Sequence, residues 1–185
     1  MADLVLYLAK WHNGIGAPWV AELSKADIMV MELYDACITR LQRRYLPMLP
    51  PFGINGLTLA GGIDLYCRLH GLPYRASWGV RGSLLWARVE QMLRLDLPVI
   101  FAVGPNVPAL WQQNKLNLYH KNAAGEYRTA AQVKAHYMMI TAMDTHWLTV
   151  TSWGKQYYVN KEEFLRYAKS HSSLLVSNLV WLRAV

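Results

Sequence analysis

Two neighbouring segments late in the chain alternate between apolar and polar residues, and a short turn separates them. The first begins at His136 and the second ends at Ser152-Trp153-Gly154. Asp144-Thr145, between them, has the residue types that favour a tight turn. This pattern predicts two antiparallel strands, residues 136–143 and 147–152. An antiparallel hairpin in the middle of the apolar part of a chain needs a sheet around it, so an all-helical fold is not expected.

The hairpin also carries a family signature. A histidine that opens one strand, followed by Ser-Trp-Gly at the close of the next, resembles the papain-like cysteine peptidase superfamily. In that family the histidine is the general base, the residue before Ser-Trp-Gly orients its ring, and the Trp covers their hydrogen bond. The resemblance therefore gives these roles to His136, Thr151 and Trp153, with Thr151 standing where papain-type enzymes have Asn. A base held in one orientation and tautomer is what general-base catalysis requires.

The order of the remaining elements supports the same resemblance. Helical periodicity covers residues 27–45, and shorter helices are predicted at 63–70, 82–95 and 162–169. Strands are predicted at 74–78, 98–103, 156–159 and 177–185. Gly56–Gly62 is interpreted as a loop or helical turn. Residues 104–134 are interpreted as a long surface loop with a short hairpin around 122–125.

Helices first and antiparallel strands later indicate an α+β fold. The resemblance implies a single papain-like domain over residues 1–185, with a central N-terminal helix packed on a mostly antiparallel sheet. Its closest likeness in arrangement is to the compact branch of the family that includes the bacteriocin-processing peptidases.

The expected nucleophile is missing from its place. A papain-like enzyme needs a thiolate at the start of its central helix, where the helix dipole and the imidazolium lower the thiol pKa. The matching stretch here is Gly16-Ala17-Pro18-Trp19, which has no cysteine. The resemblance makes Ala17 and Trp19 candidate binding residues, and Asn13 a candidate donor to an oxyanion. Ala17 is also where an engineered Cys-to-Ala change would stand.

The two cysteines lie elsewhere. Cys37 falls on the apolar stripe of the long helix and Cys67 in the following short helix. On an apolar helix face, desolvation disfavours the thiolate form and the helix dipole does not stabilise it. Both cysteines are therefore predicted to be structural and to react slowly with alkylating reagents. Two cysteines make neither a disulfide framework nor a zinc site, and a reducing compartment is the simpler inference.

Composition limits the other possibilities. An apolar fraction of 54% and a charged fraction of 17% argue against disorder. The net charge of +7 comes from scattered residues, with Arg40, Arg43 and Arg44 as a loose cluster that is interpreted as a solvated helix face. Neither a nucleic acid nor a membrane is expected as a partner, because no basic patch and no apolar span stand out. The histidines show no ligand spacing, so no metal site and no cofactor are expected.

The segment LVLYLA near the start is short, follows Asp3 and has no basic region before it, so no signal peptide is expected and a cytoplasmic location is inferred. Three functions remain open. The first is a papain-like domain that has lost its thiol and grips a peptide or protein in a cleft. The second is an active cysteine peptidase or amide hydrolase that uses Cys37, Cys67 or a replaced native cysteine. The third is a structural or interaction protein without a cleft site.

Overall fold

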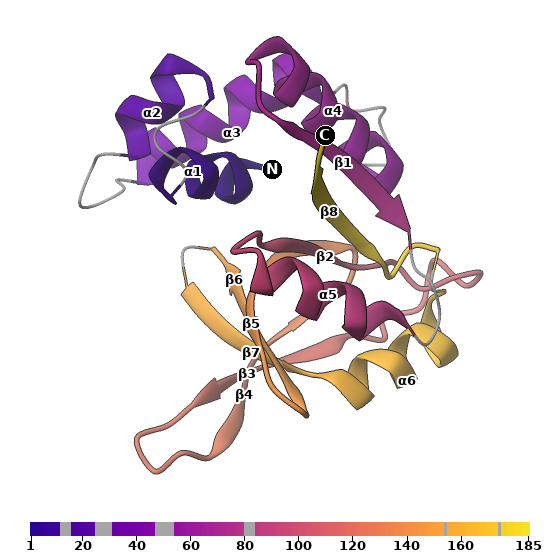
Figure 1. Ribbon diagram of the computed structural model, residues 1–185. Helices are drawn as coiled ribbons and strands as arrows, with labels where there is room; N and C mark the ends of the chain where they lie inside the picture. Colours follow the sequence, from indigo (N-terminus) through magenta and orange to yellow (C-terminus); the bar gives the residue numbers. More distant parts are fainter. Residues whose placement is uncertain (12–15, 25–30, 47–53, 80–83, 154, 174) are drawn as a thin grey trace. The chain divides into compact units, whose positions relative to one another are not determined.

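The computed structural model describes residues 1–11, 16–24, 31–46, 54–79, 84–153, 155–173 and 175–185. The chain divides into two compact units. Unit 1 holds residues 1–77 and 182–185, and unit 2 holds residues 78–181. Figure 1 shows mostly helices in unit 1 and a sheet with two helices in unit 2. The predicted α+β class is confirmed at this level.

Unit 1 is built from helices α1 (Ala2–Trp11), α2 (Pro18–Ser24), α3 (Met31–Tyr45) and α4 (Gly56–Leu69). Helix α1 contacts α2 and α3, and α3 contacts α4. The side chains at the centre of this unit are fully buried, with the rings of Tyr45 and Tyr66 edge to face at 5.3 Å between centroids. Pro18 opens α2, as expected for the first turn of a helix.

Helix α4 corrects one expectation. Gly56–Gly62 is not a loop but the first half of this helix. Asn55 caps it, its side-chain oxygen accepting from the backbone N–H of Thr58 at 2.8 Å. A Cβ on Gly62 would come within 2.5 Å of the backbone oxygen of Tyr45. The glycine is therefore needed for close packing and does not mark a break in the helix. His70 is the C-cap of this helix, and Gly71 after it has a left-handed backbone, with φ of +64°.

The sheet is antiparallel in every pairing described for its strands. The strand order is β1-β8-β2-β5-β6-β7-β3-β4. The strands are β1 (Tyr74–Gly79), β2 (Val99–Val103), β3 (Leu116–Lys121), β4 (Tyr127–Val133), β5 (His136–Met143), β6 (Trp147–Ser152), β7 (Lys155–Asn160) and β8 (Leu179–Ala184). The predicted hairpin of residues 136–152 is confirmed as β5 and β6. Its turn is closed by Asp144, whose side chain accepts from the backbone of His146 and Trp147.

Two helices complete unit 2. Helix α5 (Leu85–Arg94) contacts β2 and β5, and α6 (Lys161–His171) contacts β3 and β7. Asn160 caps α6 by accepting from the N–H groups of Glu162 and Glu163. Strand β2 is buried along its whole length, and Phe101 from β2 lies 4.5 Å from Phe164 of α6, centroid to centroid. These rings place the core of unit 2 between the sheet and α6.

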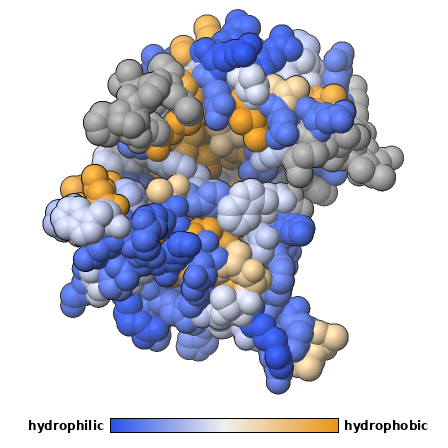
Figure 2. Space-filling model, turned by 180° about the vertical axis from the view of Figure 1, so that it is seen from behind, coloured by the Kyte–Doolittle hydropathy of each residue, from blue (hydrophilic) through white to orange (hydrophobic). Residues whose placement is uncertain are grey.

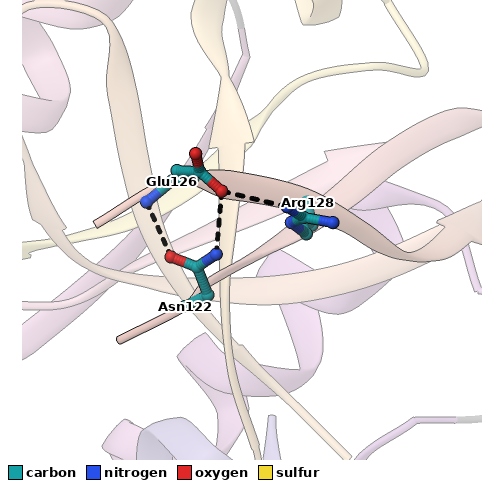
Figure 3. A network of polar contacts seen from close by, with 3 residues as sticks. All are labelled: Asn122, Glu126 and Arg128. Atoms are coloured by element: carbon teal, nitrogen blue, oxygen red, sulfur yellow. Dashed lines mark hydrogen bonds and ion pairs between the residues drawn. The ribbon is translucent and has the colours of Figure 1, made fainter. Parts of the chain in front are cut away.

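The hairpin predicted around residues 122–125 is confirmed, whereas the long surface loop predicted over residues 104–134 is wrong in its second half, where the paired strands are longer than expected. Strands β3 and β4 pair there as a hairpin. Figure 3 shows how its turn is held: Asn122 accepts from the N–H of Glu126 and donates to its carboxylate, which also pairs with Arg128 at 3.0 Å. Three mutually satisfied polar side chains make this turn self-contained, which the sequence alone did not reveal.

Two parts of the prediction concern the whole chain and stay predictions: the single papain-like domain, and the packing of the central helix, which belongs to unit 1, on the strands of unit 2. The described part of that helix begins at Met31, and its predicted beginning at residue 27 lies outside the described residues. Among the described helices, none has both the length and the apolarity to cross a membrane.

Candidate functional site

The candidate site lies where β5 begins and β6 ends. His136 is the first residue of β5, and Val103 of β2 is its partner in the sheet. In the pair formed by β5 and β6, Met139 of β5 lies opposite Thr151 of β6. Because the strands are antiparallel, Met138 lies opposite Ser152. Since side chains alternate along a strand, Ser152 shares a face with Met138 and His136, and Thr151 points to the other face.

The geometry follows from this register. Nε2 of His136 lies 2.7 Å from Oγ of Ser152, a short hydrogen bond. The indole of Trp153 stacks on the imidazole with 4.4 Å between centroids and 23° between planes. We call His136, Ser152 and Trp153 the histidine corner. Its ring is held on one edge by a hydroxyl and on one face by an indole.

The roles predicted for the three positions are therefore met in part. Trp153 covers the imidazole, as expected. The orienting hydroxyl belongs to Ser152, and the expected hydrogen bond from Thr151 to the ring is absent: Oγ1 of Thr151 is buried and has no hydrogen-bond partner among the described residues. The correction has a simple cause, because adjacent residues of a strand face opposite sides of a sheet. The alternation of β5 and β6 was visible in the sequence, but the register between them was not.

The imidazole is half-buried, and this burial lowers the pKa of His136 below its usual 6.5. The ring is therefore neutral at pH 7. A neutral imidazole has one N–H and one acceptor nitrogen. If Nε2 donates to Ser152, Nδ1 is left as an acceptor, and the opposite tautomer leaves an Nδ1–H donor. No described residue hydrogen-bonds Nδ1, so either tautomer offers this atom to a ligand.

Aromatic rings continue from the corner across the sheet. Trp153 meets Tyr157 of β7 edge to face at 6.1 Å, and Tyr157 stacks on His120 of β3 at 5.1 Å. Trp153 is 50% exposed although its ring is large, and its backbone takes a left-handed φ of +49°. A non-glycine residue in that conformation is uncommon and is often found where function constrains the backbone.

The other predicted site residues lie in unit 1 or outside the described residues. Asn13 is among the latter. Ala17 is fully buried, and its N–H donates to Oη of Tyr66 at 2.9 Å. Trp19 is half-buried beneath the guanidinium of Arg40. Ala17 presents no surface to a ligand in this arrangement, and the structure does not test its place opposite His136.

The two thiols are as enclosed as their positions predict. Cys37 is 1% exposed and Cys67 is fully buried. Desolvation raises the pKa of each from the usual 9.0 to about 11. No group of three or more histidine, cysteine or acidic side chains among the described residues is arranged to hold a metal ion.

Comparison of this chain with protein-family models and with curated proteins gave no match to either.

Proposed function

We propose that this protein is a papain-like domain without a catalytic thiol, and that its histidine corner binds a peptide or a protein segment. The observation that carries the proposal is the fixed imidazole, hydrogen-bonded at 2.7 Å on one edge and covered by a half-exposed indole on one face. The α+β class and the antiparallel sheet support it. The papain-like arrangement of the helix and sheet is part of the proposal.

A peptide suits the chemistry of this corner. Its backbone supplies both donors and acceptors, and Nδ1 of His136 can serve either with the matching tautomer. Trp153, with one half of its surface exposed, supplies area that is both apolar and rigid. Tryptophan contributes more than most residues to the binding energy of protein contacts, because it buries much surface at little cost in side-chain entropy.

Binding is favoured over hydrolysis because no described nucleophile suits the site. Both thiols are buried with raised pKa values. The Ser152 hydroxyl touches the imidazole, but this residue is only 6% exposed. A hydroxyl that cannot reach a carbonyl can orient the ring without attacking a substrate. Ser152 is thus assigned as a positioning residue.

The test begins with a random-peptide display selection on the folded protein, followed by fluorescence polarisation with the selected peptide. His136→Ala and Trp153→Ala are each expected to weaken binding about tenfold or more, with thermal midpoints close to that of the wild type. His146→Ala is the matched control for the histidine, because His146 is exposed and lies in the turn between β5 and β6, at the other end of the hairpin from the corner. This control should bind normally.

Two results would reject the proposal. One is a selected peptide whose affinity is the same for His136→Ala as for the wild type. The other is turnover of fluorogenic peptides by the purified wild-type protein that His136→Ala abolishes, which would establish the peptidase alternative instead.

A further inference from the structure

The exposed face of α3 carries an unusual group of arginines. Arg40, Arg43 and Arg44 share this face with Ala36 and Thr39, because residues three and four apart in a helix lie together. The five residues line a hollow of about 570 Å³, and all are exposed. We call this group the arginine hollow. Figure 2 shows hydrophilic and hydrophobic residues interspersed over the upper part of the face that it draws.

None of the three guanidinium groups forms an ion pair with an acidic side chain among the described residues. Other arginines do: Arg68 pairs with Asp64, Arg94 with Glu90 and Arg128 with Glu126. The sequence contains no acidic residue between Asp35 and Asp64. On the same face Glu32 precedes Arg40 by eight residues, about 12 Å along the helix axis. The hollow therefore concentrates positive charge that no described acidic residue neutralises in an ion pair.

Aromatic rings hold two of these side chains without using their hydrogen-bond donors. The guanidinium carbon of Arg40 lies 4.7 Å from the ring centre of Trp19, and that of Arg44 lies 5.8 Å from the ring centre of Tyr45. A guanidinium that stacks on a ring keeps its N–H groups in its own plane, free at the edges. Such pre-positioning lowers the entropy cost of binding.

The helix dipole explains only part of this arrangement. Arg43 and Arg44 are in the last turn of α3, where a cation is stabilised by the C-terminal end of the helix. Arg40 lies more than a turn from Tyr45 at the helix end and contacts Trp19 of a different helix. The dipole also does not account for the hollow itself. Nor does it account for the small side chains of Ala36 and Thr39 beside the arginines.

We propose that the arginine hollow binds a ligand with a phosphate group and at least two negative charges. Planar guanidinium groups form paired N–H···O bonds with phosphate oxygens, and they do so better than an ammonium group can. The Cβ atoms of residues at these spacings are about 5–6 Å apart, so neighbouring guanidinium groups reach adjacent phosphates or several oxygens of one phosphate. A soluble phosphate ester and a lipid headgroup share this chemistry.

The test uses inorganic pyrophosphate and isothermal titration calorimetry at about 0.15 M salt, where weak surface attraction is screened. The triple variant Arg40→Gln, Arg43→Gln, Arg44→Gln should raise the dissociation constant about tenfold or more. The control triple variant Arg68→Gln, Arg94→Gln, Arg128→Gln removes the same charge from paired, exposed arginines. It should bind pyrophosphate like the wild type.

Two further measurements protect the test from a folding artefact. Arg43→Gln alone alters a side chain with no described ring contact and should weaken binding several-fold. In the wild-type protein, burial and then the charge of Arg44 lower the pKa of His70, whose Nε2 is 2.9 Å from Oη of Tyr45. A bound anion offsets the charge of Arg44, so an NMR titration should show the pKa of His70 rising when pyrophosphate is added.

A second arm separates the sources of phosphate. Flotation with phosphatidylcholine vesicles, with and without phosphatidic acid, is compared with pyrophosphate binding. Retention on the phosphatidic acid vesicles, lost in the arginine triple variant and kept in the control, supports a lipid headgroup, whereas binding of pyrophosphate alone supports a soluble ligand. The proposal is overturned if neither probe binds, if both triple variants lose binding equally, or if a single-stranded oligouridylate binds and the two phosphate probes do not.

Discussion

At the scale of single residues, Ser152 takes the role that the family resemblance gives to Thr151. Ser152 makes the hydrogen bond to His136, while the buried Oγ1 of Thr151 has no described partner. An unsatisfied buried hydroxyl costs free energy, and its replacement by a methyl group of similar shape removes that cost.

We therefore expect Thr151→Val to leave the free energy of unfolding unchanged or to raise it by up to about 1 kcal/mol, and Ser152→Ala to lower it by about 1 kcal/mol. Urea denaturation of the two variants measures both values. If Thr151→Val is the more damaging, Thr151 does orient the ring and the assignment to Ser152 is wrong.

The protonation of His136 gives a second expectation at this scale. Its pKa is lowered by burial, so the unfolded chain binds a proton to this ring more readily than the folded protein does. Stability from this group is complete above the unfolded value near 6.5 and is lost as the pH falls through the lower folded value.

His136→Gln should remove that part of the pH dependence. Thermal midpoints measured from about pH 7.5 down to about pH 5 should fall less steeply for the variant than for the wild type. Equal slopes for the two proteins would mean that the imidazole keeps an ordinary pKa.

At the scale of elements, the sequence predicts those whose signals are local. Alternation located β5 and β6, and the strand predicted at 98–103 and the helix predicted at 162–169 correspond to β2 and α6. Prediction from sequence fails where a contact between residues far apart in the chain determines the local structure. Gly62 looks like a helix breaker until the backbone of Tyr45 is seen against it. Strands β3 and β4 are largely polar and half-exposed, so their alternation carries little hydrophobic signal and their turn depends on side-chain bonds around Asn122.

The segment between β2 and β3 illustrates such a distant contact. The side chain of Asn106, 1% exposed, accepts from the N–H of Asn114, donates to the carbonyl of Asn114 and donates to Oη of Tyr167. One amide thus closes the loop at both ends and ties it to α6. Trp111, within this loop, is 79% exposed.

Asn106→Ala should lower the free energy of unfolding by about 2–3 kcal/mol, because it leaves buried donors and acceptors unpaired. Asn122→Ala removes a similar number of hydrogen bonds at the exposed turn of Figure 3 and should cost less than about 1 kcal/mol, since water replaces them. Chemical denaturation compares the two. Equal losses would show that the Asn106 amide is accessible to water.

At the scale of the whole molecule, the residues assigned to the site from sequence divide between the two units. His136, Thr151 and Trp153 belong to unit 2, and Ala17 and Trp19 to unit 1. A motif can predict residue types and the strands that carry them. It cannot predict which hydroxyl meets the imidazole, because that depends on the register of β5 against β6. The sequence does show Arg40, Arg43 and Arg44 as a loose cluster on a predicted helix, but it cannot show the hollow that they line or which acidic side chains lie close enough to pair with them.

Both cysteines also belong to unit 1, and their state bears on the function of the whole chain. A pKa of about 11 in place of 9.0 leaves about a hundredfold less thiolate at neutral pH, and burial further hinders access of a reagent. We expect iodoacetamide to label neither thiol appreciably in the folded protein at about pH 7.5, and to label both rapidly in guanidinium chloride. Mass spectrometry of the single variants Cys37→Ser and Cys67→Ser assigns each rate. Rapid labelling of either thiol in the folded protein, at a rate that hardly changes between about pH 6 and about pH 8, would reveal a stabilised thiolate. That result would restore the cysteine peptidase alternative, because the chain would then hold the nucleophile that its histidine corner lacks.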